Sequence, residues 1–229
     1  MILFLSAPIG EELSKACAVL FLARFIDSPK RGFQIGFSVG LGFALLENMI
    51  YILGALFTGE GAAISFVFTA ILRAIGSIPG HATWTGITGY AIGCYVINKR
   101  WNKMSVGVFD KSKTNLESQW ILFNKKSGQP MISSKSEIGI TSIPKWLSAG
   151  QDKMITMTEK PVKAILIAII CHSLWNGSLW LTSVILQDSS LLIQIIANIV
   201  TIITLIVLLW VILRRLIPYA LEEGNITTE

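Results

Sequence analysis

Charged residues are scarce in this sequence. Only 14% of its 229 residues are aspartate, glutamate, lysine or arginine, whereas a typical soluble domain has about 25%. Hydrophobic residues make up 52%, and they gather in runs of about 20 residues or more, the length that spans a bilayer. These features exclude an ordinary water-soluble domain. They predict an all-α protein, a polytopic bundle of transmembrane helices.

Cysteine is also rare. The three cysteines, Cys17, Cys94 and Cys171, lie in separate apolar segments. Three is an odd number, and the spacing fits no metal motif, so we expect buried free thiols. The N-terminus lacks the basic region and the small-residue cleavage site of a secretory signal peptide. We therefore expect the first apolar run to act as its own anchor.

The net charge of +5 does not indicate a nucleic-acid partner, because the basic residues lie in the gaps between apolar segments. Such gaps mark the cytoplasmic side of a membrane protein. The basic residues that flank the apolar segments are Arg24, Lys30, Arg31, Lys99, Arg100, Lys103, Arg214 and Arg215. Their placement predicts a multi-pass protein of the cell membrane with its N-terminus outside and its C-terminus in the cytoplasm. The sequence does not indicate an oligomeric state.

Five apolar segments are expected to cross the membrane: residues 1–26, 33–57, 80–97, 162–186 and 191–213. Residues 62–78 are not counted as a span. The turn before them carries no lysine or arginine and is expected outside, whereas the basic residues after residue 97 are expected inside, so the chain crosses the membrane only once between them. The stretch 62–78 is either an interfacial or re-entrant helix on the outer side or the start of one long tilted helix. The predicted fold therefore has about five spans plus this one helix.

A polar segment at residues 99–162 separates the helices of 1–98 from those of 163–217. Alternating residues at 119–123 and a turn signal at 126–130 predict a small hairpin within it. We assign this insert to the cytoplasm, where it is either a recognition or regulatory element or a solvated loop. Residues 218–229 are expected to form a disordered tail.

Glycines recur every four residues in the second apolar segment, at Gly32, Gly36 and Gly40. This spacing removes side chains from one face of a helix and allows the backbone of a neighbouring helix to approach closely. We expect a packing role for these glycines.

Ionisable residues inside the apolar segments are the main functional signal. An ionised carboxylate there costs roughly 2.5–3.5 kcal/mol on insertion scales, and Glu11 and Glu12 are adjacent in the first segment. Glu47, His81 and His172 follow in later segments, and the protein has no other histidines. At a rise of about 1.5 Å per residue, Glu12, Glu47, His81 and His172 are expected at similar depths in the membrane. The pattern predicts a functional cluster.

Glutamate and histidine together suit hydrolysis. They can activate a water directly, or through a metal ion held by two histidines and a carboxylate. Asn176 lies four residues after His172 on the same helix face, where its amide could donate to a developing oxyanion. Lys15 shares a face with Glu11 and is expected to pair with it, whereas Glu12 points about 100° away, toward another helix.

The same residues carry a resemblance to a known family. The four motifs are Glu11-Glu12-x-x-Lys15, Glu47-Asn48-x-x-Tyr51, Pro79-Gly80-His81 and His172-x-x-Trp175-Asn176. They resemble the motifs of the PrsW family of intramembrane proteases, which is similar in turn to the CAAX prenyl proteases and their bacterial Abi relatives. The resemblance covers about residues 10–176 without the polar insert. The family usually has helices before its Glu-Glu motif, so this chain resembles a short or truncated member.

The resemblance implies cleavage of a peptide bond in a membrane protein substrate, in or near the bilayer. It assigns catalytic roles to six residues: Glu11, Glu12, Glu47, His81, His172 and Asn176. The two N-terminal glutamates would activate water and the asparagine would polarise the carbonyl. Glu47, His81 and His172 are the candidate ligands of zinc, and a metal-free glutamate mechanism is equally compatible. Arg73 and Tyr51 are weaker candidates, for which we expect structural roles.

Two other classes of protein also bury charges in membrane helices. An ion-coupled transporter uses such residues as proton relays, although the inverted repeats expected of many carriers are not found between the two halves. A non-catalytic scaffold would use them only to pair helices. Both alternatives stay open on the sequence.

Overall fold

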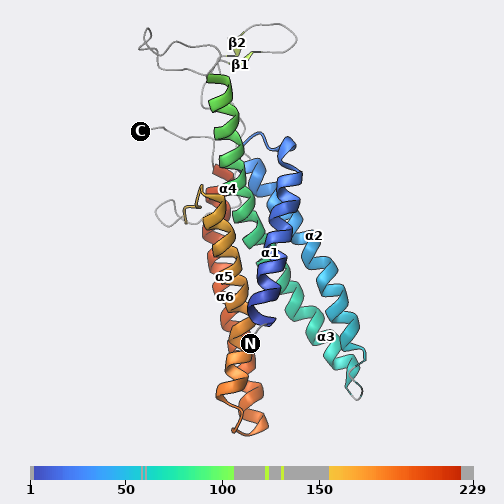
Figure 1. Cartoon of the computed structure of the whole chain (residues 1–229). Helices are drawn as coiled ribbons and strands as arrows, with labels where there is room; N and C mark the ends of the chain where they lie inside the picture. Colours follow the sequence, from blue (N-terminus) through green and yellow to red (C-terminus); the bar gives the residue numbers. More distant parts are fainter. Residues whose placement is uncertain are drawn as a thin grey trace.

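The computed structural model describes residues 3–57, 59, 61–105, 122–123, 130–131 and 155–222. Within them the chain is a bundle of long helices (Figure 1). The helices are α1 (Leu3–Phe21), α2 (Pro29–Ala55), α3 (Ala62–Leu72), α4 (Ile78–Ser105), α5 (Pro161–Ile185) and α6 (Leu191–Glu222). The short elements are η1 (Ala23–Phe25), the π-helical turn η2 (Arg73–Ser77), and the strands β1 (Leu122–Phe123) and β2 (Pro130–Met131). The prediction of an all-α bundle is confirmed.

Four helical segments in the described residues are long and apolar enough to cross a membrane: Pro29–Ala55, Ala62–Arg100, Pro161–Ile185 and Leu191–Ala220. Large hydrophobic side chains are exposed along their outer faces, as expected of helices that face lipid rather than water. α1 has 19 residues and holds three charged residues in its central turns. The protein is a polytopic membrane protein. α1, predicted as the first of about five spans, is not among these four segments.

The structure decides between the two alternatives for residues 62–78. α3, η2 and α4 follow one another without a break, so Ala62–Arg100 is a single helical segment of 39 residues. Residues 62–78 are therefore the start of one long helix, and they do not form a separate interfacial or re-entrant helix. The regular hydrogen bonding of this segment is interrupted by the π-helical turn and by Pro79.

The backbones of α2 and α4 lie in contact, which confirms the prediction from the glycine spacing. A Cβ atom added at Gly32, Gly36 or Gly40 would collide with backbone atoms of α4, and at Gly40 the nearest atom is the carbonyl oxygen of His81. The tightest part of this helix pair therefore leads directly to one of the two histidines.

The connection between α1 and α2 is held by side-chain hydrogen bonds. Ser28 caps α2, because its Oγ accepts from the Arg31 backbone N–H at 3.1 Å. From the far end of α4, the Arg100 guanidinium donates to the carbonyl of Ile26 and, at 3.0 Å, to that of Ala23. The Ala23 carbonyl begins η1 and also accepts from the Ile26 backbone N–H at 3.1 Å, whereas Ile26 follows the last residue of η1. Arg100 thus ties the end of α4 to both sides of this short helix.

Replacing Arg100 with alanine is expected to lower the free energy of unfolding by about 1 kcal/mol, since two carbonyls lose a charged donor. Thermal unfolding of the purified protein in detergent measures this change. The matched Arg214→Ala variant removes an exposed arginine from α6 and should leave the midpoint unchanged. Equal midpoints for the two variants would contradict this role for Arg100.

The predicted hairpin is confirmed. β1 and β2 pair antiparallel, with Leu122 opposite Met131 and Phe123 opposite Pro130. The rest of the predicted insert between α4 and residue 155 lies outside the described residues.

α6 extends beyond the boundary predicted at residue 217. It continues past its two arginines to Glu222, because Leu216 and Ala220 pack in a buried cluster with Phe33 and Tyr90. The predicted tail therefore begins inside a helix, and residues 223–229 lie outside the described part.

The cysteines are free thiols, as expected, but their burial differs from the prediction. Cys94 is buried, Cys171 is intermediate and Cys17 is exposed. Cys17 lies on an outward face of α1, where a small apolar side chain needs no polar partner.

Candidate active site

Four helices bring their ionisable side chains together at one place. Glu11 and Glu12 come from α1, Glu47 from α2, His81 from α4 and His172 from α5. Two Glu–His contacts of 3.0 Å join the group, one between Glu12 Oε1 and His172 Nδ1 and one between Glu47 Oε2 and His81 Nε2. The predicted convergence is therefore present.

Lys15 lies at the centre of this cluster. Its Nζ is 2.8 Å from Glu12 Oε1, 2.7 Å from His81 Nδ1 and 3.5 Å from Glu11 Oε2. The predicted pair with Glu11 exists, but the contact with Glu12 is shorter. An ammonium group can only donate, so His81 Nδ1 accepts from it and Nε2 faces Glu47. Only 1% of the Lys15 side chain is exposed. Its charge is therefore stabilised by these partners rather than by water.

His172 connects the two glutamates of α1. Its Nδ1 is 3.0 Å from Glu12 Oε1, and its Nε2 is 3.8 Å from Glu11 Oε2. The imidazole stacks on Trp84, with ring centroids 5.0 Å apart, and meets His81 edge-on at 4.8 Å. The sequence analysis missed Trp84, and its only sequence signal is the spacing of three residues from His81, which places both on one helix face.

Arg73 holds Glu47 from the π-helical turn η2. Its Nη2 is 3.0 Å from Glu47 Oε2, its Nε donates to Asn48 Oδ1, and its guanidinium lies 3.9 Å from the centroid of the Tyr51 ring. Ser77, at the end of the same turn, donates to Asn48 Oδ1 at 3.1 Å. We expected Arg73 and Tyr51 to be structural, and the structure places both beside the cluster.

The turn η2 is also tied to α5 and α6. In a regular α-helix the carbonyl of Ile75 would accept from residue 79, but Pro79 has no N–H. Trp210 of α6 fills this role, because its Nε1 donates to the Ile75 carbonyl at 3.2 Å. On the next residue, a Cβ at Gly76 would come within 2.8 Å of the Trp175 ring of α5. Together with Asn48 of α2, the side chains of Trp175 and Trp210 therefore hold the turn that precedes His81.

The donor set fits a metal ion. Glu11, His81 and His172 each offer one ligand atom, and these atoms lie within 4.8 Å of one another. Two histidines and a carboxylate are a ligand set of catalytic zinc. Among the described residues, Glu11 Oε2 accepts no hydrogen bond, and its nearest charged neighbours are Lys15 Nζ at 3.5 Å and His172 Nε2 at 3.8 Å. A cation beside the two histidines would give this oxygen a partner.

The carboxylate grouped with the two histidines is Glu11, whereas the sequence pointed to Glu47. Glu47 Oε2 is 3.0 Å from both His81 Nε2 and the Arg73 guanidinium. It therefore stays a predicted ligand, with an arginine as competing partner. Asn176 is partly buried one turn after His172, and within the described residues no hydrogen bond joins it to the cluster, so its role stays a prediction.

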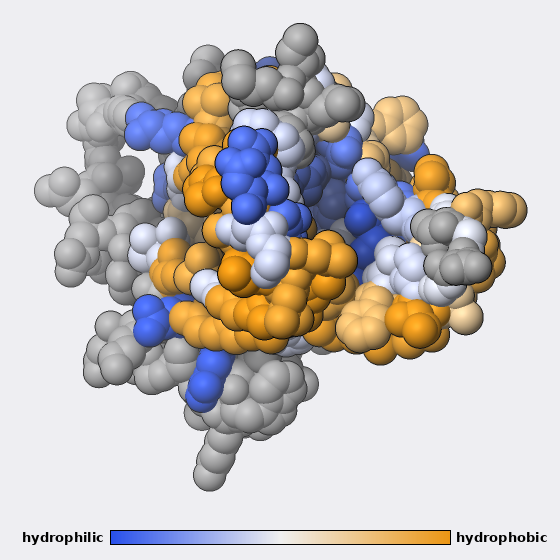
Figure 2. Space-filling view, turned by 90° about the horizontal axis from the view of Figure 1, so that it is seen from below, coloured by the Kyte–Doolittle hydropathy of each residue, from blue (hydrophilic) through white to orange (hydrophobic). Residues whose placement is uncertain are grey.

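The three glutamates differ in how far their side chains are exposed. The side chain of Glu12 is 1% exposed, whereas those of Glu11 and Glu47 are 22% and 20% exposed. Figure 2, seen from below, shows hydrophilic surface in a recess between the hydrophobic surfaces of the helices. Glu11 and Glu47 are thus the carboxylates that a water or substrate can reach.

Comparison with known proteins supports the resemblance noted in the sequence. Residues 1–112 match the family model described as PrsW family intramembrane metalloprotease. The N-terminal half of this chain is similar to that family. A curated relative, Protease PrsW from Geobacillus kaustophilus (strain HTA426), is 37% identical over 93 residues, which are 39% of this chain and 37% of the relative. The chain thus matches little more than a third of the length of this PrsW protease. No solved structure matches the chain significantly.

The matched region holds most of the cluster but not all of it. Glu11, Glu12, Glu47 and His81 lie within residues 1–112. His172 lies in α5, outside the matched residues, and still places its Nδ1 3.0 Å from Glu12 Oε1. The part of the chain beyond the match to the family model therefore contributes a side chain to the site.

Proposed function

We propose that this protein is an intramembrane protease of the PrsW type, which hydrolyses a peptide bond of a membrane protein substrate. The observation that carries the proposal is the contact of His172 with Glu12 and its approach to Glu11 and His81. A second histidine from a distant helix completes a hydrolytic donor set whose other members lie in the region similar to PrsW proteases.

Glu11, His81 and His172 would hold the metal ion, with Glu47 within reach. Zinc in such a site would polarise the scissile carbonyl and lower the pKa of a bound water. Glu12 accepts from His172 Nδ1 and thereby orients the ring, as carboxylates commonly do for metal-binding histidines. Because Glu12 is buried and doubly engaged, it positions His172 and does not itself contact water.

Glu47 is the best-placed general base. Its side chain is 20% exposed, so a water can reach it, and His81 Nε2 and Arg73 Nη2, each 3.0 Å from Oε2, hold the carboxylate in place. In this proposal Glu47 takes a proton from the attacking water while the water oxygen bonds to the carbonyl carbon. It then gives the proton to the amide nitrogen as the C–N bond breaks. Asn176 is proposed to donate to the oxyanion, and the same proton route serves a metal-free mechanism.

The direct test is cleavage of a single-span membrane substrate by the full chain in liposomes. Wild-type protein is expected to cleave it, whereas His172→Ala and Glu47→Gln should lose about 100-fold or more in rate. Glu159→Gln, which changes an exposed glutamate before α5, is the matched control and should cleave normally.

A strong chelator separates the two mechanisms. Loss of cleavage that zinc restores supports the metal route, and unchanged cleavage after verified metal removal supports the glutamate route. Equal product from all variants would refute this site. Substrate-independent proton uptake without cleavage would favour an ion-coupled transporter, and neither activity would favour a scaffold with buried charge pairs.

A further inference from the structure

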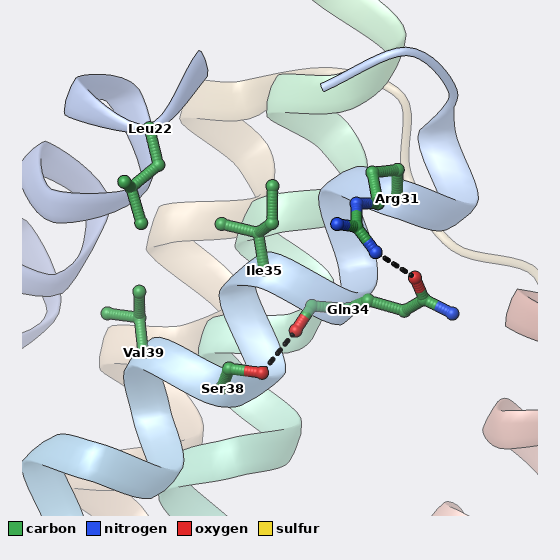
Figure 3. A pocket seen from close by; sticks show the side chains of 6 residues that line it. All are labelled: Leu22, Arg31, Gln34, Ile35, Ser38 and Val39. Carbon is green, nitrogen blue, oxygen red and sulfur yellow. Dashed lines mark hydrogen bonds between the residues drawn. The ribbon is translucent and has the colours of Figure 1, made fainter. Parts of the chain in front are cut away.

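A hollow separate from the cluster lies between the C-terminal end of α1 and the first turns of α2 (Figure 3). It is lined by Leu22, Arg31, Gln34, Ile35, Ser38 and Val39. Figure 3 shows Arg31, Gln34 and Ser38 along one side of α2, and Ile35 and Val39 on the side toward Leu22, which comes from the end of α1. The hollow therefore has one polar and one apolar wall.

The polar residues on the exposed face of α2 are confined to this hollow. Arg31, Gln34 and Ser38 are all exposed, whereas the large exposed side chains from Leu41 to Leu53 are hydrophobic or aromatic. A helix face that meets only acyl chains gains nothing from an arginine and an amide. The polar residues at this end of α2 therefore indicate a polar partner.

The free donors of the hollow are arranged for an acceptor-rich ligand. Arg31 Nη1 donates to Gln34 Oε1 at 3.3 Å, which occupies the amide oxygen and leaves the amide NH2 group to donate outward. The guanidinium has further N–H groups. Ser38 is satisfied internally, because its Oγ donates to the Gln34 carbonyl at 2.9 Å. Arg31 and Gln34 thus present donors side by side, as phosphate recognition requires.

The surrounding charge is positive. The connection between α1 and α2, together with the first turn of α2, holds Arg24, Lys30 and Arg31 against a single acidic residue, Asp27. Asp27 accepts from Ser28 at 3.1 Å. Because this connection follows the positive-inside pattern, it is expected at the inner leaflet.

The two free donors, on Arg31 and Gln34, lie nearer the surface of that leaflet than Val39, whereas Ser38 lies at the depth of the acyl chains. Arg31 and Ser38 are separated by about 10 Å along the helix axis, and each headgroup region is about 5–7 Å thick. When Arg31 lies at the phosphate level, Ile35 and Val39 lie at the level of the acyl chains.

We propose that this hollow binds one anionic glycerophospholipid of the inner leaflet, with its phosphate on Arg31 and Gln34 and an acyl chain along Leu22, Ile35 and Val39. A lipid is favoured over a soluble anion because the polar wall is continuous with an apolar wall, formed by Leu22, Ile35 and Val39, that an inorganic anion would not use. The bound lipid bridges α1 and α2, and so stabilises the helix that carries Glu12 against the helix that carries Glu47. The site stands independently of the proposed protease activity.

The test titrates the purified full chain in detergent with phosphatidylglycerol, with phosphatidylcholine of the same acyl chains, and with inorganic phosphate. The thermal unfolding midpoint and native mass spectrometry report binding. Phosphatidylglycerol is expected to bind with one molecule per chain and to raise the midpoint in a saturable way. Arg31→Gln should weaken its apparent affinity about fivefold to tenfold.

Two further variants separate this site from general surface charge and from misfolding. Arg24→Gln removes a neighbouring charge that does not line the hollow and should bind within about twofold of wild type. Val39→Trp fills the apolar wall while all charges remain, and should weaken binding as much as Arg31→Gln. Equal binding of the two lipids, an equal effect of Arg24→Gln, unchanged binding by Val39→Trp, or reproduction of the shift by inorganic phosphate would each overturn the proposal.

Discussion

Replacing Lys15 with methionine is expected to produce the largest loss of stability of any single substitution in the site. Lys15→Met keeps the length of the side chain but removes the ammonium that lies 2.8 Å from Glu12 Oε1 and 2.7 Å from His81 Nδ1. The Glu12 carboxylate, 1% exposed, would keep only His172 as a partner. Removing one partner of a buried ion pair destabilises a protein by about 3–5 kcal/mol. Thermal unfolding followed by helical circular dichroism in detergent measures the loss.

Two variants make the Lys15 prediction specific. Lys163→Met makes the same change at an exposed position of α5 and should unfold like wild type. The double variant Lys15→Met/Glu12→Gln removes both charges, so it should recover much of the stability. It should still be inactive, because His172 and His81 have lost the groups that orient them. A double variant as unstable as Lys15→Met alone would show that the pair does not act through its charges.

The second large effect is expected at Gly40. A Cβ at this position would collide with the His81 carbonyl, so Gly40→Ala must push α2 and α4 apart. Overpacking of this kind costs about 1–3 kcal/mol, and here it also displaces a residue of the site. We expect a lower unfolding midpoint and a loss of cleavage of about tenfold or more, since small misplacements of catalytic groups have large effects on rate.

Gly42 provides the matched control for Gly40. It lies on the same helix, and a Cβ added there would meet nothing within 4 Å. Gly42→Ala should therefore stabilise α2 by about 0.5–1 kcal/mol, because alanine restricts the unfolded chain and favours helix. The two glycine-to-alanine changes are thus expected to shift the midpoint in opposite directions. A shift of the same sign would argue against backbone contact between α2 and α4.

The helices and the convergence of the site could be predicted because the bilayer imposes strong rules on sequence. A membrane helix must be long and apolar, so Glu12, Glu47, His81 and His172 were conspicuous within their segments. The glycine spacing likewise has one dominant structural meaning in such a helix. These features are local in sequence, and they identified both the bundle and the residues that meet in it.

Contacts that depend on the path of the chain could not be predicted in the same way. Arg73 faces Glu47 only because α3, η2 and α4 form one continuous segment beside α2, and the sequence left that continuity open. Trp84 was missed because a tryptophan in an apolar helix is unremarkable until the stacked histidine is known. The end of α6 was misjudged because Arg214 and Arg215 were taken as the end of the helix, whereas packing of Leu216 sustains it.

The hydrogen bond from the Trp210 indole to the Ile75 carbonyl affects how α6 is aligned in the bundle. Two apolar helices surrounded by lipid gain little by choosing one axial alignment over another, because sliding exchanges one hydrocarbon contact for an equivalent one. A directional hydrogen bond reduces that degeneracy, because the indole N–H reaches the Ile75 carbonyl at only a small range of rotations and heights of α6. The contact of 3.2 Å between the hydroxyls of Thr182 in α5 and Thr201 in α6 acts in the same way. These few polar contacts thus help to set the register of a helix whose surface is otherwise almost entirely apolar.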